Sequence, residues 1–356
     1  MSEAFRVGYT HDFLKPDGTI GWGDIGMARY EGIPNLEAEF MPEHPMVLPA
    51  EFVQGYDALG VLAPRITAEL LDNSPRLALV ARFGVGYDSV DCEAATRNGI
   101  AVSITPTGVR RAVASTALTM LLGAAHRIVE KDQITRAGAW GTKLNYMGFQ
   151  VTGKTLGMIG LGNIGREFLK LIAPYEMNVL AYDPYISEEQ AAASGARKVE
   201  LDELLAEADY VVILCNLTPE TFHLMNAERF AQMKPTAILV NVARGPIVEE
   251  TALYDALANG QIRYAATDVF EKEPPDPDNP LFALGNIIVA PHALGWTEES
   301  AMGIGTSVIE SVLAVRAGRA PATLANPEVV DSPIFQQKLA DLAARLPGSS
   351  VQCPES

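Results

Sequence analysis

Short apolar runs alternate with stretches of helical periodicity along nearly the whole chain, and this alternation limits the possible folds more than any other feature. The runs predicted as strands are residues 5–9, 58–62, 78–82, 155–159, 179–182, 210–214, 237–241, 265–269 and 287–290. Between them, apolar residues recur at helical spacing, as in 166–172, 188–193, 226–233 and 249–259. Strands that alternate with helices build parallel sheets covered by helices. We therefore expect an α/β fold.

Three segments depart from this alternation. Residues 107–136 are predicted as one long helix, because their apolar residues fall on a helical stripe. Four prolines between residues 273 and 280 exclude helix and central strand there. The tail carries a helical pattern over 335–346, and its last residues are expected to fray. A chain of 356 residues has room for two domains, and the long helix is predicted to connect them or to form a dimer surface.

Charge and composition exclude several classes of function. Lys and Arg number 27 against 44 Asp and Glu, which gives a net charge of −17. We expect no binding to nucleic acid or to anionic membranes. No transmembrane run or signal peptide is recognised, which predicts a cytoplasmic protein. Cys92, Cys215 and Cys353 are far apart and predict neither a disulfide framework nor, with only five histidines, a metal site.

A glycine-rich turn follows the apolar run 155–159 and opens a helical pattern. In a dinucleotide-binding turn, Gly160 permits the tight bend, Gly162 lets a pyrophosphate approach the backbone, and Gly165 lets the helix pack closely. The next strand ends at Asp183, 18 residues past Gly165, where a carboxylate binds ribose hydroxyls and repels a 2′-phosphate. This pattern predicts a site for NAD(H) in preference to NADP(H). The alternative is that the glycines only shape a turn and that Asp183 caps a strand end.

Polar side chains follow three later strands. Arg244 follows run 237–241, Asp268 and Glu273 follow the apolar residues 264–267, and His292 comes after the last run. Carboxyl ends of parallel strands meet at one edge of a sheet, where ligands bind. His suits proton donation near neutral pH, a carboxylate orients it, and Arg binds and polarises an anionic substrate. Taken singly, each residue also has a structural interpretation: a hydrogen-bonded His, an Arg bracing a turn, a solvated Glu.

Taken together, these motifs resemble those of the D-isomer-specific 2-hydroxyacid dehydrogenase family, which includes D-lactate, glyoxylate/hydroxypyruvate and 3-phosphoglycerate enzymes. The segments that carry the resemblance are 160–165, 241–246, 268–275, 291–292 and 84–88. The resemblance implies two Rossmann-like domains, one flavodoxin-like and one dinucleotide-binding, with the active site in the cleft between them. The corresponding ranges are a substrate domain of 1–106 and 297–330, an NAD-binding domain of 107–296, and a C-terminal tail of 331–356.

The resemblance also implies roles for individual residues. Arg244, Glu273 and His292 would be the catalytic set, reducing a small 2-oxoacid to its (R)-2-hydroxyacid with NADH and catalysing the reverse oxidation. The backbone N–H groups of Val85 and Gly86 would bind the substrate carboxylate. Further cofactor contacts would come from Thr116, Asn163, Ile164, Cys215, Asn216, Ala243 and Asp268, of which Asp268 would bind the nicotinamide carboxamide.

A second function stays open. C-terminal binding protein corepressors share the family's motifs and use NAD(H) to set a dimer that recruits peptides. Two residues close to His292, Leu294 and Trp296, depart from the usual family pattern, as does Asn216, where family members usually have Pro. A tryptophan shortly after the histidine is a feature of the corepressor branch.

The segment 107–136 is also predicted to form a homodimer surface. Ala117, Leu118, Leu121, Leu122 and Ala125 widen its apolar stripe beyond what one packing partner covers. Symmetric pairing of two copies is the simplest way to bury the remainder, and members of the family commonly dimerise through this region.

Overall fold

The computed structural model describes residues 4–346 and divides the chain into two units. The first comprises Met1–Val109 and Trp296–Ser356, and the second comprises Arg110–Gly295. Both units are α/β, and every pairing between named strands in them is parallel. The expected fold class is therefore confirmed.

The first unit contains a five-stranded sheet in the order β2-β1-β3-β4-β5. Its strands are β1 (Phe5–Tyr9), β2 (Leu36–Phe40), β3 (Ala58–Val61), β4 (Leu79–Arg82) and β5 (Ala101–Ser103). Its helices are α1 (Ala68–Asp72), α2 (Cys92–Arg97), α10 (Glu298–Arg316) and α11 (Pro333–Arg345). Strands β3, β4 and β5 are buried at every residue, which is typical of parallel strands covered on both faces.

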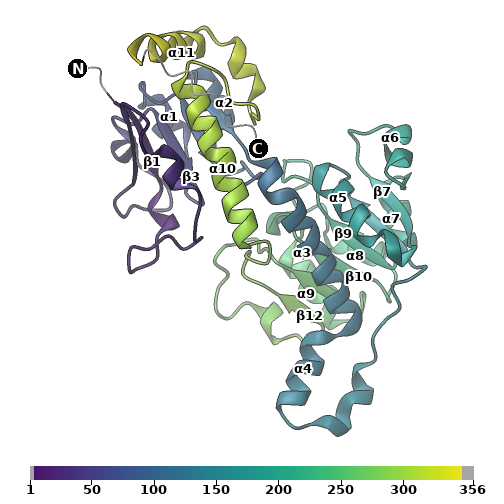
Figure 1. Cartoon of the computed structure of the whole chain (residues 1–356). Coiled ribbons are helices and arrows are strands. Elements are labelled where there is room, and N and C mark those ends of the chain that lie inside the picture. The colour runs from purple at the N-terminus through teal and green to yellow at the C-terminus, as the bar shows by residue number, and fades with distance from the viewer. Residues whose placement is uncertain (1–3, 347–356) are drawn as a thin grey trace. The chain divides into compact units, whose positions relative to one another are not determined.

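The second unit contains a seven-stranded sheet in the order β12-β11-β10-β9-β6-β7-β8 (Figure 1). Its strands are β6 (Thr155–Ile159), β7 (Asn178–Tyr182), β8 (Arg197–Lys198), β9 (Tyr210–Ile213), β10 (Ile238–Asn241), β11 (Tyr264–Thr267) and β12 (Ile287–Val289). Its helices are α3 (Pro106–His126, which begins in the first unit), α4 (Ile128–Arg136), α5 (Asn163–Ile172), α6 (Glu188–Ala193), α7 (Leu201–Glu207), α8 (Ala227–Gln232) and α9 (Glu250–Ala258).

Two apolar clusters cover the seven-stranded sheet. One joins α3 and α5 to the sheet through residues such as Leu121 and Phe168. The other joins α7, α8 and α9 through residues such as Leu204, Phe230 and Leu253. This double covering leaves the carboxyl ends of the strands as the edge from which loops emerge, and such edges carry the ligand sites of open parallel sheets.

The nine predicted strands lie within one residue of the observed ones at most ends, but three observed strands were not predicted. Strand β2 is an edge strand whose outward positions carry glutamates, so it lacks a continuous apolar run. Strands β5 and β8 have only three and two residues, too few to show a period.

The prediction of a single helix over 107–136 is wrong. The helix breaks between α3 and α4 at Arg127, which adopts a left-handed conformation with φ of 53°, and the two parts are bent by 59°. The Arg127 guanidinium pairs with Glu130 at 2.9 Å and lies over the Tyr146 ring, 5.0 Å from its centroid. These contacts stabilise the bend. Among the described helices none is by itself long and apolar enough to cross a membrane, and α3 with α4 meets that test only as a bent pair.

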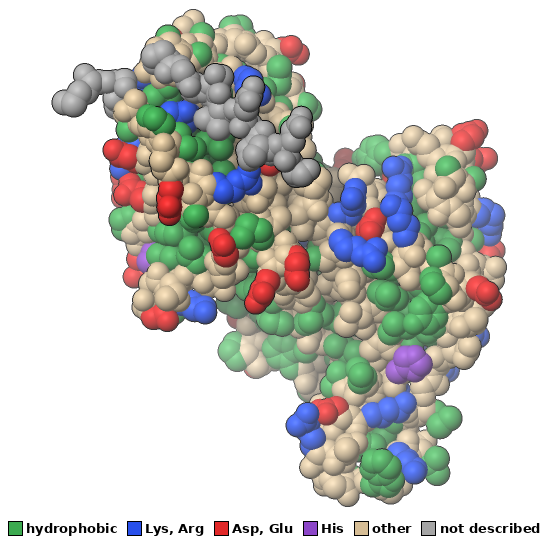
Figure 2. Space-filling view, viewed as in Figure 1, with side chains coloured by type: hydrophobic (Ala, Val, Ile, Leu, Met, Phe, Trp, Pro, Cys, Tyr) green, Lys and Arg blue, Asp and Glu red, His purple; other side chains and the backbone are tan. Residues whose placement is uncertain are grey.

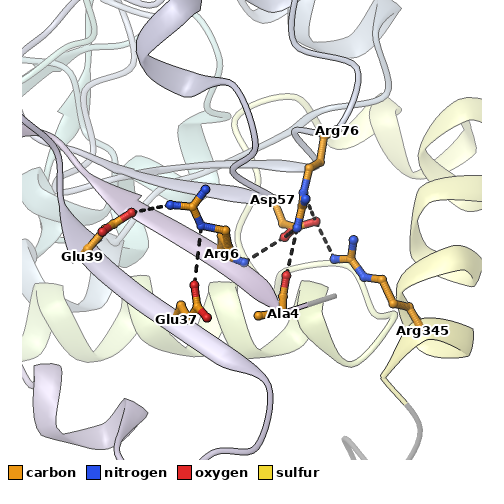
Figure 3. A network of polar contacts seen from close by, with 7 residues as sticks. All are labelled: Ala4, Arg6, Glu37, Glu39, Asp57, Arg76 and Arg345. Atoms are coloured by element: carbon orange, nitrogen blue, oxygen red, sulfur yellow. Dashed lines mark hydrogen bonds and ion pairs between the residues drawn. The ribbon is translucent and has the colours of Figure 1, made fainter. Parts of the chain in front are cut away.

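The segment predicted as a C-terminal tail is part of the first unit as far as the structure describes it. Helix α11 buries Phe335, Leu339 and Leu342, and its Arg345 binds the buried carboxylate of Asp57 at 2.6 Å. Figure 3 shows that the same carboxylate also pairs with Arg76, at 2.8 Å. The end expected to fray, residues 347–356, lies outside the described residues.

Candidate functional site

The glycine-rich turn between β6 and α5 has the geometry that the fingerprint requires. Gly160 has a φ of 94°, and a Cβ there would lie 2.7 Å from the backbone nitrogen of Cys215. A Cβ on Gly165 would lie 2.9 Å from the carbonyl oxygen of Gly160. Around Gly162, by contrast, the space is open. Two glycines therefore permit close packing within the chain, and the third leaves backbone accessible at the start of α5, where N–H groups and the helix dipole favour a phosphate.

Asp183 lies beside this turn. One carboxylate oxygen accepts the Leu161 N–H at 2.8 Å, and the other accepts the Tyr185 N–H at 3.0 Å. The structure thus brings together the glycines and the acidic residue that the sequence placed 18 positions apart. A carboxylate has about four acceptor sites, so these two bonds leave capacity for ribose hydroxyls. The residues fit a dinucleotide.

Cys215 and Asn216 follow β9 directly and lie next to the turn, as the contact with Gly160 shows. Burial raises the pKa of the Cys215 thiol to about 12. The thiol is therefore neutral at physiological pH and is not activated as a nucleophile.

The catalytic candidates gather at the carboxyl edge of neighbouring strands. His292 Nδ1 and Glu273 Oε2 are 2.8 Å apart, with exposed side-chain fractions of 45% and 38%. The other oxygen of Glu273 accepts the Phe270 N–H at 3.0 Å. Burial alone would raise the pKa of Glu273, but hydrogen bonding and charge from His292, the Phe270 N–H and the charge of Arg244 lower it below its ordinary value. Glu273 is therefore a carboxylate at neutral pH.

The loop that carries Arg244 is held from two sides. The Asn241 amide donates to the Arg244 carbonyl at 3.0 Å and its oxygen accepts the Ala243 N–H at 3.1 Å. The next residue, Gly245, packs so closely on Phe270 that a Cβ would lie 1.8 Å from the Phe270 carbonyl carbon. Any side chain at 245 would push the Arg244 loop away from the loop of Glu273. The glycine therefore allows the loop of Arg244 to pack directly against the loop of Glu273.

Asp268 has a positioning contact that sequence reasoning missed. Its oxygens accept the N–H groups of Ala293, at 3.2 Å, and Leu294, at 3.3 Å. Burial raises the pKa of Asp268 above its ordinary value, although these N–H groups and the charge of His292 oppose the shift. His292 itself is held in a left-handed conformation with φ of 56°. Asp268 thus fixes the turn that presents His292.

Two glutamates brace the loop of Glu273 against α9. Glu250 accepts the Glu271 N–H at 2.6 Å, and Glu271 accepts the Glu250 N–H at 2.7 Å. The second oxygen of Glu250 accepts the Asn279 side-chain amide at 2.8 Å. Glu250 therefore ties both ends of the proline-rich loop, a function with no sequence signal beyond an acidic residue in the first turn of a helix.

Thr116 lies in the second unit, close to Gly295, which comes three residues after His292. It is buried on α3, and a Cβ on Gly295 would lie 3.6 Å from its hydroxyl oxygen. The remaining cofactor candidates, Asn163 and Ile164, are the first two residues of α5.

Val85 and Gly86 belong to the first unit, in the loop that follows β4. Arg82, the last residue of β4, is buried and braces this loop. Its guanidinium donates to the Gly86 carbonyl at 3.0 Å, to the Val61 carbonyl at 3.2 Å and to the carbonyl of Leu62. The loop therefore has a fixed shape and keeps half-buried backbone at residues 84–86.

Comparison with known proteins identifies the family. Residues 118–293 match the model of the D-isomer specific 2-hydroxyacid dehydrogenase NAD binding domain. A glyoxylate reductase from Thermococcus gammatolerans is 42% identical over 83% of this chain and 91% of its own length. A D-3-phosphoglycerate dehydrogenase from Archaeoglobus fulgidus is 40% identical over 75% of this chain, which spans only 50% of that longer protein.

A solved structure agrees with the sequence relatives. The D-lactate dehydrogenase of Aquifex aeolicus, complexed with NAD and lactic acid, superposes with a TM-score of 0.79 at 26% identity. The match covers 90% of this chain and 99% of that one. The residues expected for the catalytic set and for the dinucleotide turn lie in loops that follow strands of the seven-stranded sheet. The chain belongs to the D-isomer specific 2-hydroxyacid dehydrogenase family.

Proposed function

We propose that the chain interconverts a small 2-oxoacid and its (R)-2-hydroxyacid, with NAD(H) as the cofactor. The observation that carries this proposal is the 2.8 Å contact between His292 and Glu273 at the strand edge that also presents Arg244. A general acid, a carboxylate that orients it and a cation are the groups that carbonyl reduction needs. When bound, NADH supplies the hydride.

Each catalytic residue has a defined task in the proposed reaction. The Glu273 carboxylate accepts a hydrogen bond from Nδ1–H of His292 and so favours imidazolium, which leaves Nε2–H to protonate the substrate carbonyl oxygen. Arg244 binds the substrate and stabilises the developing oxyanion. The N–H groups of Val85 and Gly86 hold the substrate carboxylate, so the first unit acts as the substrate domain and the second as the NAD-binding domain.

Turnover tests this proposal directly. The protein should oxidise NADH in the presence of 2-oxoacids, and His292→Ala should reduce kcat by about 10²-fold or more while leaving NADH affinity nearly unchanged, because a general acid contributes roughly 10²–10⁴-fold. Dimerisation that depends on NAD(H), with no turnover of any 2-oxoacid, would instead support the corepressor-like function.

We also propose that Asp183 selects NAD(H) over NADP(H). The position of its carboxylate beside the glycine-rich turn supports this role. Asp183→Ala should weaken NADH binding and narrow the difference in Kd between NADH and NADPH, since both ribose hydrogen bonds and a repulsion with the 2′-phosphate are removed. An unchanged ratio of the two dissociation constants would exclude Asp183 as the ribose ligand.

We propose that the chain forms a homodimer and that its surface extends beyond the predicted stripe. Ala117, Leu121 and Ala125 of α3 are fully buried in the core of their own unit, whereas Leu118 and Leu122 are half-buried. Further exposed apolar side chains lie on the arm formed by α4 and the 3-10 helix Trp140–Tyr146 (Figure 2). They are Ile128, Val129, Trp140, Leu144 and Met147.

An exposed apolar arm is costly in water unless a partner covers it. We propose that a second copy of the chain does so, which extends the dimer surface to residues 128–147. Sedimentation at micromolar concentration should show a species of twice 38.2 kDa, and Leu144→Asp should shift it toward the monomer. A wild-type chain that sediments at 38.2 kDa would refute the dimer.

A further inference from the structure

Four aromatic side chains of the first unit form a continuous row from its core to its surface. Phe13 and Phe83 are buried, and their ring centroids are 5.0 Å apart. Trp22 packs on Phe83, also at 5.0 Å, and Trp296 packs on Trp22 at 4.2 Å with an interplanar angle of 38°. At the outer end of the row, Trp296 has an exposed fraction of 54%.

This row is continuous with the loop proposed to bind the substrate carboxylate. Phe83 is the residue immediately before Gly84, Val85 and Gly86. Arg82, on its other side, fixes that loop through the Gly86 carbonyl. In a 2-oxoacid, the keto carbon that bears the substituent is bonded directly to the carboxylate carbon. Because Trp22 packs on Phe83, which directly precedes this loop, we expect a substituent held by the loop to lie beside the aromatic row.

Both tryptophans are held by ordered local structure. Trp22 lies in a turn that follows a bridge between Leu14 and Ile20, and the Gly21 N–H donates to the Phe13 carbonyl at 2.7 Å. Trp296 directly precedes Thr297, which caps α10 through a reciprocal pair of side-chain bonds with Ser300. The rings therefore lose little further conformational entropy when a ligand packs on them.

The chemistry of the row favours an apolar ligand group. Half of the Trp296 surface stays exposed although its neighbours are ordered, and exposed aromatic area next to a binding loop is typical of a ligand contact. The buried Arg82, which directly precedes Phe83, donates to the carbonyls of Val61, Leu62 and Gly86. It thus serves the loop rather than a second anionic group on the substrate.

We propose that Trp22 and Trp296 bind the substituent on the keto carbon of the substrate, so that the preferred 2-oxoacids carry a branched aliphatic or aromatic group rather than hydrogen, carboxylate or phosphate. This inference rests on the proposed 2-oxoacid reductase activity and names its substrate class. It also gives a function to the two tryptophans, one of which the sequence marks as a departure from the family pattern.

The test compares substrates of different size in the same enzyme. Initial rates with NADH are measured for glyoxylate, which has no substituent, and for 4-methyl-2-oxopentanoate and phenylpyruvate. The wild type should have a higher kcat/KM for the two apolar acids. Trp296→Ala and Trp22→Ala should lower kcat/KM for these acids about 10- to 100-fold, mainly through KM, since that is the range that buried apolar contacts supply. Their kcat/KM for glyoxylate should change less than threefold.

Two controls make the result specific. Trp296→Phe keeps an aromatic face and should retain most of the selectivity. Ile334→Ala removes another apolar side chain of the first unit, on α11 beside Gly99 and with an exposed fraction of 50%. It should change kcat/KM neither for glyoxylate nor for the two apolar acids. Equilibrium binding of 2-hydroxy-4-methylpentanoate to the NAD⁺-loaded protein gives a second readout, which Trp296→Ala should weaken.

The outcomes separate this inference from the proposed function. The wild type could reduce glyoxylate while Trp296→Ala keeps the same selectivity between glyoxylate and the apolar acids. This result would overturn the inference and leave the reductase activity intact. Faster turnover of phenylpyruvate in Trp296→Ala would overturn it as well, because the ring would then exclude large substituents. A wild type that reduces no 2-oxoacid would refute the proposed function. In that case, equal affinity of Trp296→Ala and the wild type for 2-hydroxy-4-methylpentanoate would refute the inference independently.

Discussion

At the scale of single residues, the site depends on how a few side chains are oriented by their neighbours. Glu273 orients His292, Asp268 fixes the turn after it, and Asn241 fixes the loop of Arg244. None of these three supporting contacts is made to the substrate itself. Their effect is to hold an imidazole and a guanidinium in the geometry that proton transfer and anion binding require.

The pair of Glu273 and His292 makes a prediction about pH. The lowered pKa of Glu273 keeps it ionised through the neutral range, so its charge stabilises imidazolium. In Glu273→Gln the ion pair between this carboxylate and the imidazolium is lost. The alkaline limb of the kcat/KM profile for 2-oxoacid reduction should therefore move to lower pH. Profiles that superimpose between the wild type and the variant would count against the pairing.

At the scale of elements, the residues proposed for the chemistry lie on loops between strands and helices, and neighbouring elements hold these loops. Glu250 in the first turn of α9 holds the loop of Glu273 at both ends. Gly245 holds the neighbouring loop against Phe270. The site is thus built by contacts between successive βα connections as well as within them.

Loss of the Glu250 anchor should affect chemistry more than cofactor binding. In Glu250→Ala the loop of Glu273 gains freedom, and kcat should fall about tenfold, since small misplacements of catalytic groups are costly. The KM for NADH should stay unchanged, and Glu250→Gln, which keeps an acceptor oxygen, should restore most of kcat. Glu249→Ala is the matched control, because within residues 4–346 the Glu249 side chain bonds to Thr251 of its own helix end and not to the loop of Glu273. Equal losses in both alanine variants would argue against an anchoring role.

At the scale of the whole molecule, buried charge ties the C-terminal helix into the first unit. Asp57 is almost inaccessible and pairs with both Arg76 and Arg345 (Figure 3). Removal of one partner from a buried ion pair leaves uncompensated charge. This contact explains why a segment predicted as a tail is an integral part of its unit.

Asp57→Ala should therefore lower the free energy of unfolding by about 3–5 kcal/mol, because two arginines lose their buried counter-ion. Urea denaturation followed by circular dichroism measures the change. Asp72→Ala breaks an ion pair with Arg97 that is exposed on both sides and should have little effect. If the two variants were equally stable, the Asp57 cluster would not anchor α11.

The sequence predicted the parts of the molecule that local patterns determine. Buried parallel strands have continuous apolar runs, and the glycine-rich turn has a fixed spacing, so both were located closely. The break at Arg127 was not predictable, because it depends on Glu130 and on the Tyr146 ring, which lies outside the helix. The bonds of Asp268 to the turn after His292, and those of Arg82 to three carbonyls, likewise arise from tertiary contacts that leave no periodic signal.

Transfer of a labelled hydride tests the central claim most directly. The protein is incubated with NADH deuterated at both C4 positions and with 4-methyl-2-oxopentanoate or glyoxylate, and the product is analysed by NMR and chiral chromatography. The account predicts deuterium at C2 of the hydroxyacid, the (R) configuration for the branched product, and transfer slowed by about 10²-fold or more in His292→Ala. An (S) product, a product without deuterium, or transfer that is equally fast without His292 would contradict it.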